Sequence, residues 1–321
     1  MPPNRRRLPK TLGAPSAVAL PRIADRLGFL YLDTVQIKAD RNGVCALVEF
    51  DDGQQERVYL PTAGIGCILL GPGTSTTHEA VKRLTKDGAV IVHVGDGGVR
   101  CYSAFLNDST TTRILDRQVE IIADDAKRLA AARRLFTIRF DDELPDLLTL
   151  DKLRGLEGRR MKVLYRTLAQ QHRIPRFKRS YDPDDFDAQD PVNKALTSGN
   201  QALYGIVAAV LLSLGASPAL GILHHGQQRA FALDIADLYK AEVTIPLAFS
   251  LHASTDPERT ARLRLREDFR LLRLIPRIIT DVYKVLDLPV SDSPGPSGLI
   301  NLWDPEGDVP SGVNYADEVG W

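Results

Sequence analysis

The period of the hydrophobic pattern changes once along this chain, and that change constrains the fold more than any other feature. Residues 28–105 contain short alternating or β-branched runs separated by Gly, Asn and Asp turn residues, among them FLYLDTVQIKA, GVCALVEF and AVIVHV. After the polar stretch 107–112, apolar residues recur every three or four positions, as in amphipathic helices. The sequence therefore predicts an α+β fold with strands first and helices second.

These patterns also suggest boundaries: an N-terminal arm at 1–24, a β domain at 25–106 with one helix at 76–86, a linker at 107–115, a helical domain at 116–288, and a flexible Pro- and Gly-rich acidic tail at 289–321. The first buried helical stripe is predicted to comprise Leu115, Val119, Ile122, Ala126, Leu129 and Phe136. Further helices are expected at 150–171, from Pro191 to a stop at Gly215 with Asp190 as N-cap, at 231–239 and at 256–286.

The net charge of zero hides a strong asymmetry. No Lys or Arg follows Lys284, and seven acids do, so the first 284 residues carry +7 and the tail −7. Residues 152–179 hold ten Lys or Arg against one acid, Glu157. A stripe of one sign predicts contact with a polyanion such as DNA, and the plain alternative is a solvated helix face.

Cysteine use and hydropathy predict the compartment. Cys45, Cys67 and Cys101 are widely spaced and lie in strand-like segments, which indicates buried free thiols rather than disulfides. No run approaches the ~18 apolar residues of a membrane span, and the start MPPNRRRLPK lacks the apolar core of a secretion signal. We expect a cytoplasmic protein without membrane contact.

Three acids and a histidine pair are the residues suited to chemistry. Asp234 and Asp237 lie three apart on a predicted helix, so both should project from one side, and His224 and His225 precede them in the turn-like GILHHG. Carboxylate and imidazole ligands without cysteine favour Mg²⁺ or Mn²⁺. The alternative is helix capping for the Asp pair, and for Glu157 a surface ion pair with Arg154 or Arg160.

Four motifs occur together and in order: LRGLEG around Glu157, YDPDDF from Tyr181, ALYG ending at Gly205, and GILHHGQQRAFALDIADLYK at 221–240. With them the chain resembles the CRISPR-associated Cas-one (Cas1) family of spacer-acquisition integrases and endonucleases. The ending DIADLYK resembles the type I-E (Cascade) branch. The resemblance implies a β-sandwich-like N-terminal domain followed by a larger all-α catalytic domain.

The resemblance also implies the site. Its metal ligands would be Glu157, His224 and Asp237, holding Mg²⁺ or Mn²⁺, with Asp234 as a supporting catalytic acid and His225 as the alternative to His224. The protein would join protospacer 3′-hydroxyl ends to a CRISPR repeat by transesterification. It would act as a homodimer, two of which sandwich a dimer of the small Cas-two (Cas2) protein on double-stranded DNA.

The expected DNA contacts come from two sources. The basic stripe contributes Arg154, Arg159, Arg160 and Lys162, and the resemblance implies Arg100, Tyr181, Tyr204, Arg259 and Arg262. Two positions depart from the family. Thr34 stands where relatives have a tyrosine that opens the duplex end, with Tyr31 nearby on an undetermined face, and Gln227 stands where they have a lysine that helps select the protospacer-adjacent motif.

The sequence is also compatible with two other functions. A stand-alone metal-dependent nuclease for branched or single-stranded DNA would need the same cluster but no partner. A non-catalytic DNA-binding scaffold would use Glu157 and the Asp pair only as structural charges, and its binding would not depend on a divalent ion.

Overall fold

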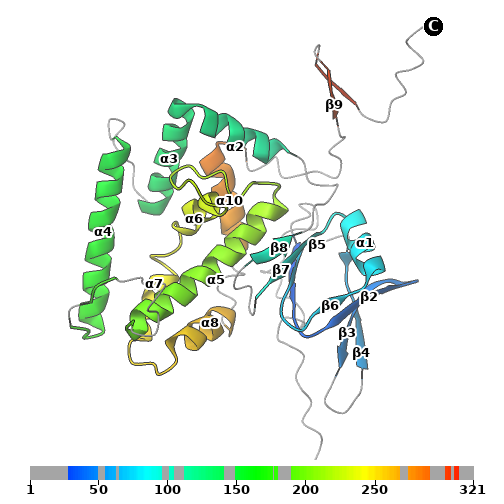
Figure 1. Ribbon diagram of the computed structural model, residues 1–321, viewed down its shortest axis with the longest axis horizontal. Helices are drawn as coiled ribbons and strands as arrows, with labels where there is room; N and C mark the ends of the chain where they lie inside the picture. Colours follow the sequence, from blue (N-terminus) through cyan, green and yellow to red (C-terminus); the bar gives the residue numbers. More distant parts are fainter. Residues whose placement is uncertain are drawn as a thin grey trace, which may run out of the picture.

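Strands precede helices in the structure, which confirms the mixed α+β class (Figure 1). This computed structural model describes residues 28–49, 55–62, 65–95, 101–104, 112–140, 149–175, 177–179, 189–267, 274–289, 301–304 and 307–310. The predicted arm and most of the predicted linker and tail lie outside the described residues. Within the tail, β9 (Asn301–Asp304) pairs antiparallel with β10 (Gly307–Pro310).

The N-terminal strands form two four-stranded sheets. One has the order β1 (Gly28–Leu32), β5 (Ile65–Leu70), β7 (Val90–Val94), β8 (Cys101–Ala104), and the other has the order β4 (Gln55–Tyr59), β3 (Gly43–Glu49), β2 (Gln36–Asp40), β6 (Ser75–Thr76). In the first sheet β1, β5 and β7 are parallel and β8 is antiparallel. A parallel pair needs a long crossover, which α1 (His78–Lys86) supplies between β5 and β7.

Both faces of the first sheet are buried, because alternate side chains enter different cores. Cys67 and Leu69 of β5 lie in the core that the helices share, whereas Ile68 and Leu70 lie in the core beneath the second sheet and α1. The helical core therefore continues across the predicted 107–115 boundary. This burial explains the almost unbroken apolar run of β5.

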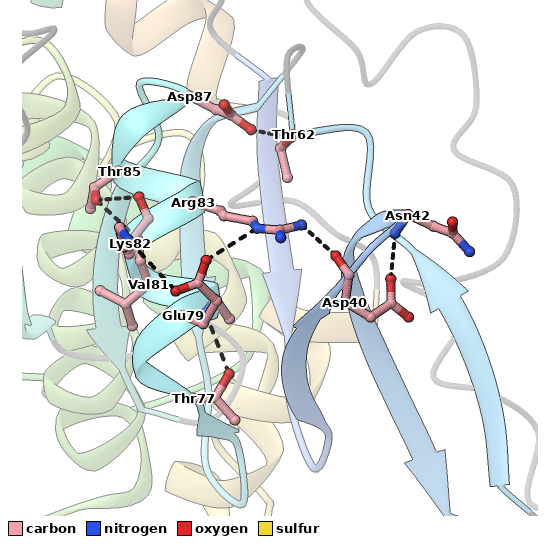
Figure 2. Close-up of polar contacts among 11 residues, drawn as sticks. Asp40, Asn42, Thr62, Thr77, Glu79, Val81, Lys82, Arg83, Thr85 and Asp87 are labelled. Carbon is pink, nitrogen blue, oxygen red and sulfur yellow. Dashed lines mark hydrogen bonds and ion pairs between the residues drawn. The ribbon is translucent and has the colours of Figure 1, made fainter.

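Polar contacts fix α1 over the second sheet (Figure 2). The Thr77 hydroxyl accepts from the Ala80 amide at the helix start, and Arg83 donates to the Asp40 carbonyl at the end of β2 while pairing with Glu79. At the far end Thr62 Oγ1 donates to Asp87 over 2.5 Å. Capping and cross-links together hold the crossover on the sheet.

The helical part consists of α2 (Arg113–Ala123), α3 (Asp125–Phe140), α4 (Leu150–Gln171), α5 (Pro191–Ser213), α6 (Ala230–Ala236), α7 (Thr244–Ser250), α8 (Pro257–Glu267) and α10 (Ile275–Leu286). α5 crosses the centre of the molecule towards the first sheet, and α4 stands at the opposite edge (Figure 1). Asp190 caps α5 and Gly215 follows it at φ 74°, as predicted.

Among the described residues α5 alone is long and apolar enough to cross a membrane. However, 72% of its apolar window is buried inside the protein. It is the central helix of the core, where an all-round apolar sequence is expected. The three cysteines are free, as the sequence predicts, with Cys45 and Cys67 buried and Cys101 half-buried.

Two helix predictions are wrong in detail. The region 115–136 forms two helices, because the backbone at Asp124 is extended (φ −123°, ψ 115°) and resets the helical phase. Val119 and Leu129 of the predicted stripe are consequently 52% and 37% exposed, while Ile121 and Leu135 are buried. The predicted helix 256–286 is likewise described as α8 and α10.

The observed orientation of α2 predicts which of two substitutions lowers the unfolding free energy more. Ile121→Ala should cost about 2–5 kcal/mol of unfolding free energy, because it removes a side chain that is 1% exposed. Val119→Ala should change it by no more than about 0.5 kcal/mol. Urea denaturation of both variants measures this, and the reverse order would restore the stripe read from the sequence.

Candidate active site

Helices α3, α4 and α6 bring one arginine and two carboxylates together. Arg139, in the last turn of α3, places Nη1 2.6 Å from Glu157 Oε1 on α4 and 3.6 Å from Asp237 Oδ2 at the C-cap of α6. The Arg139, Glu157 and Asp237 side chains are 10%, 24% and 17% exposed. The alternative, an ion pair of Glu157 with Arg154 or Arg160 on its own helix, is therefore wrong: Arg154 lies 3.9 Å from Asp151, and Arg160 stacks on Phe140.

A second cation touches Asp237 from the other side. Lys240, three residues further on, forms an ion pair with Asp237 Oδ1, and its Nζ lies 4.9 Å from the ring centroid of Tyr204 on α5. Burial lowers the pKa of Lys240, but Asp237 and Tyr204 outweigh it and raise that pKa. The ammonium is therefore charged, and Asp237 lies between two cations.

Asp234 points elsewhere and organises the loop before α6. Its carboxylate is fully buried and accepts the backbone N–H groups of Ile222, Leu223 and His224, and Oδ1 lies 2.7 Å from His224 Nδ1. The sequence predicted that Asp234 and Asp237 would project from one side of the helix. That prediction is wrong, because the two carboxylates face different groups. Asp234 positions His224, whereas Asp237 faces Arg139 and Lys240.

Glycine is required where this loop begins. A Cβ on Gly221 would lie 2.3 Å from the His224 carbonyl oxygen and 2.7 Å from Ala230 Cβ. Because Gly221 has no side chain, the backbone at His224 and Ala230 can pack against it, and the loop between α5 and α6 can turn tightly. His224 is 40% exposed on its side chain, and the neighbouring His225 is exposed.

The site's electrostatics reflect burial and pairing. Burial raises the pKa of Glu157 although the charge of Arg139 opposes it, and the hydrogen bond that His224 donates to Asp234 raises the pKa of His224 against burial. Glu157, His224 and Asp237 lie within electrostatic reach of one another. Yet among the described residues no three His, Cys, Asp or Glu side chains stand close enough to hold one metal ion, and Arg139 contacts both carboxylates.

The expected DNA-binding residues are distributed over several elements. Tyr204 joins the cluster through Lys240, and Arg262 reaches Ser198 of α5 and Glu258. Six of them are exposed: Arg154, Arg159, Arg160 and Lys162 on α4, Gln227 in the loop before α6, and Arg259 on α8. Arg100 and Tyr181 lie outside the described residues. Tyr31 is 5% exposed and donates to Asp33, so it faces the core.

Sequence reasoning missed two members of the site, Arg139 and Lys240. Lys240 had a usable signal, because it lies three residues after Asp237 in the quoted motif. Arg139 had none, since its partners are distant in sequence.

Comparison with known proteins decides the family. The sequence profile described as "CRISPR associated protein Cas1" matches residues 137–260, which contain the whole cluster. The "CRISPR-associated endonuclease Cas1 2" of Thermus thermophilus is 37% identical over 319 residues, covering 97% of each chain. The chain belongs to the Cas1 family.

Further Cas1 proteins agree. The "CRISPR-associated endonuclease Cas1" of Clostridium sp. is 34% identical over 304 residues, which cover 93% of this chain and 99% of that protein. The crystal structure of a TtCas1–DNA complex matches with a TM-score of 0.75 and 38% identity, covering 83% of this chain and 99% of the other. These matches confirm the Cas1 family that the motifs suggested, while the type I-E branch stays a prediction.

The Asp234–His224 pair makes a pH-dependent prediction. Asp234→Asn removes the carboxylate that raises the pKa of His224, so that pKa should fall and burial should hold it below its ordinary value. In the wild type, the pair's stabilisation is complete below the unfolded-state pKa of His224 and is lost as pH rises through the raised folded-state pKa. The variant should lack this loss.

Proton NMR titration of the metal-free wild type and of Asp234→Asn measures the His224 pKa in each protein, with His224→Gln used to assign the resonance. An unchanged His224 pKa in Asp234→Asn would show that the carboxylate does not control the imidazole.

Proposed function

We propose that this protein is the integrase of CRISPR spacer acquisition, a metal-dependent DNA endonuclease and strand transferase. It joins protospacer 3′-hydroxyl ends to the CRISPR repeat by transesterification. The carrying observation is that one buried carboxylate fixes His224 within electrostatic reach of two further carboxylates, Glu157 on α4 and Asp237 at the end of α6. The Cas1 matches and the DNA-bound relative support the class of reaction.

The types of donor atom at this site suit Mg²⁺ or Mn²⁺. Asp234 holds Nδ1 of His224, which leaves Nε2 as the ligand atom, and such a carboxylate partner is usual for metal-binding histidines. Asp237 Oδ1 is buried and, its ion pair with Lys240 aside, makes no hydrogen bond of ordinary geometry. Glu157, His224 and Asp237 would hold the ion, and hard carboxylate oxygens suit either metal.

The chain's own groups would bind and orient the DNA. A bound divalent ion would supply charge neutralisation of the phosphate and activation of the attacking hydroxyl. Lys240 would add positive charge beside it, with the half-buried Tyr204 of α5 against the ammonium. Asp234 keeps the imidazole in one orientation throughout.

The DNA path would follow the exposed cations of α4 into this cluster. Arg154, Arg159 and Lys162 are exposed on the helix that carries Glu157, so backbone phosphates could reach both together. Arg259 and Arg262 extend the basic surface from α8. Arg100, Tyr181 and Gln227 complete the proposed contacts.

The proposed assembly is a homodimer, two copies of which hold a Cas2 dimer, in the type I-E branch and in the cytoplasm. End-splaying would differ from relatives, because Thr34 sits at φ 54° in the loop between β1 and β2 and Tyr31 is buried. The protospacer-adjacent preference would differ as well, because Gln227 is neutral.

Strand transfer tests this function. A short duplex with free 3′ hydroxyls should be joined to a supercoiled CRISPR-repeat plasmid in the presence of purified Cas2 and Mn²⁺, and not in EDTA. Asp237→Ala and Glu157→Gln should each lower joining by at least about 100-fold, because each removes a proposed ligand. Asp151→Asn is the matched control, since that acid lies on the same helix and its side chain is 94% exposed.

Each outcome separates the candidates. Metal-dependent cutting without joining would replace the integrase by the stand-alone nuclease. DNA binding that ignores Mn²⁺ and EDTA, with no cut or joined product, would favour the scaffold.

A further inference from the structure

Arg139 is the only described side chain that pairs with both proposed carboxylate ligands. A single nitrogen, Nη1, contacts Glu157 Oε1 at 2.6 Å and Asp237 Oδ2 at 3.6 Å. The two acids come from different helices and lie close enough for the charge of Asp237 to act on Glu157. Without a cation between them their negative charges would repel, so the arginine holds α4 and α6 together at this point.

The arginine is itself poorly hydrated, with a side chain only 10% exposed. A guanidinium removed from water requires anionic partners, and carboxylates meet its hydrogen-bonding geometry. Its contacts therefore belong to the folded site, unlike the solvated pairs of Lys82 and Arg83 with Glu79 on α1. An exposed pair of that kind contributes little.

The two oxygens that face Arg139 cannot turn to one metal ion while its guanidinium lies between them. A Mg²⁺ ion requires its oxygen ligands at about 2.1 Å in a nearly octahedral arrangement, and a guanidinium wedged between two of them prevents that approach. Lys240 engages only the other oxygen of Asp237. Arg139 is therefore the group that must move when both acids turn to one ion.

We propose that Arg139 is a built-in cation, which holds Glu157 and Asp237 together in the metal-free protein and is exchanged for the divalent ion. This inference rests on the metal site of the proposed function. It makes Arg139 a positioning residue that keeps the two acids folded and near each other. It also makes the metal affinity of the free protein weaker than the ligands alone would provide.

The test is titration of metal-free protein with Mn²⁺ alone, following the electron paramagnetic resonance signal of free Mn²⁺. Arg139→Gln should bind Mn²⁺ at least tenfold more tightly than wild type, equivalent to ~1.4 kcal/mol, because no cation has to be displaced. Arg139→Lys keeps a charge without the planar fork and should fall between the two.

Thermal unfolding provides the second readout. In EDTA, Arg139→Gln should melt below wild type, and saturating Mn²⁺ should raise its Tm by more than it raises that of wild type. Arg134→Gln is the matched control, because Arg134 lies on the same helix but serves the Val285 carbonyl and Asp287. Its loss should lower Tm equally with and without Mn²⁺ and leave the Mn²⁺ affinity unchanged.

The outcomes separate the two claims. Equal or weaker Mn²⁺ binding by Arg139→Gln, or an unchanged Tm in EDTA, would overturn the exchange. If wild type and Arg139→Gln both fail to bind Mn²⁺, the metal site of the proposed function falls instead.

Discussion

The buried carboxylate of Asp234 is the interaction on which the site's geometry depends. It accepts three successive backbone N–H groups and pairs with His224, so one anion satisfies a tight loop and orients an imidazole. A carboxylate removed from water is tolerated only with such compensation. Since α6 carries Asp234 and ends at Asp237, the same seven-residue helix links the loop to the charged cluster.

The helical core fixes the elements that meet at this cluster. α5 is buried along most of its length and packs against the first sheet, α6, α7 and α8. Tyr239, directly before Lys240, is fully buried and donates to Asp281 of α10 over 2.8 Å. Lys240 is thus attached to a buried part of the core, which is what a site with precise spacing requires.

The charges of α4 are divided between its two sides. Glu157 is the one acid within the stripe 152–179, and it is the acid that turns inward to Arg139 while its neighbours Arg154, Arg159 and Arg160 remain exposed. The helix therefore presents cations to solvent and one anion to the core. This division matches a surface for a polyanion and a site for a cation on one element.

The sequence by itself determined the order of strands and helices, the N-cap and stop of α5 and the free thiols, because these follow from local periodicity and composition. Its motifs also led to Glu157, His224 and Asp237 as proposed ligands. It did not determine the phase of α2 and α3, the parallel strands, the burial of Asp234 or the role of Arg139. Those depend on partners far apart in the chain, such as Arg139 with Asp237, and local patterns do not encode which distant groups meet. Only tertiary packing decides that, since burial makes an unpaired charge too costly to leave alone.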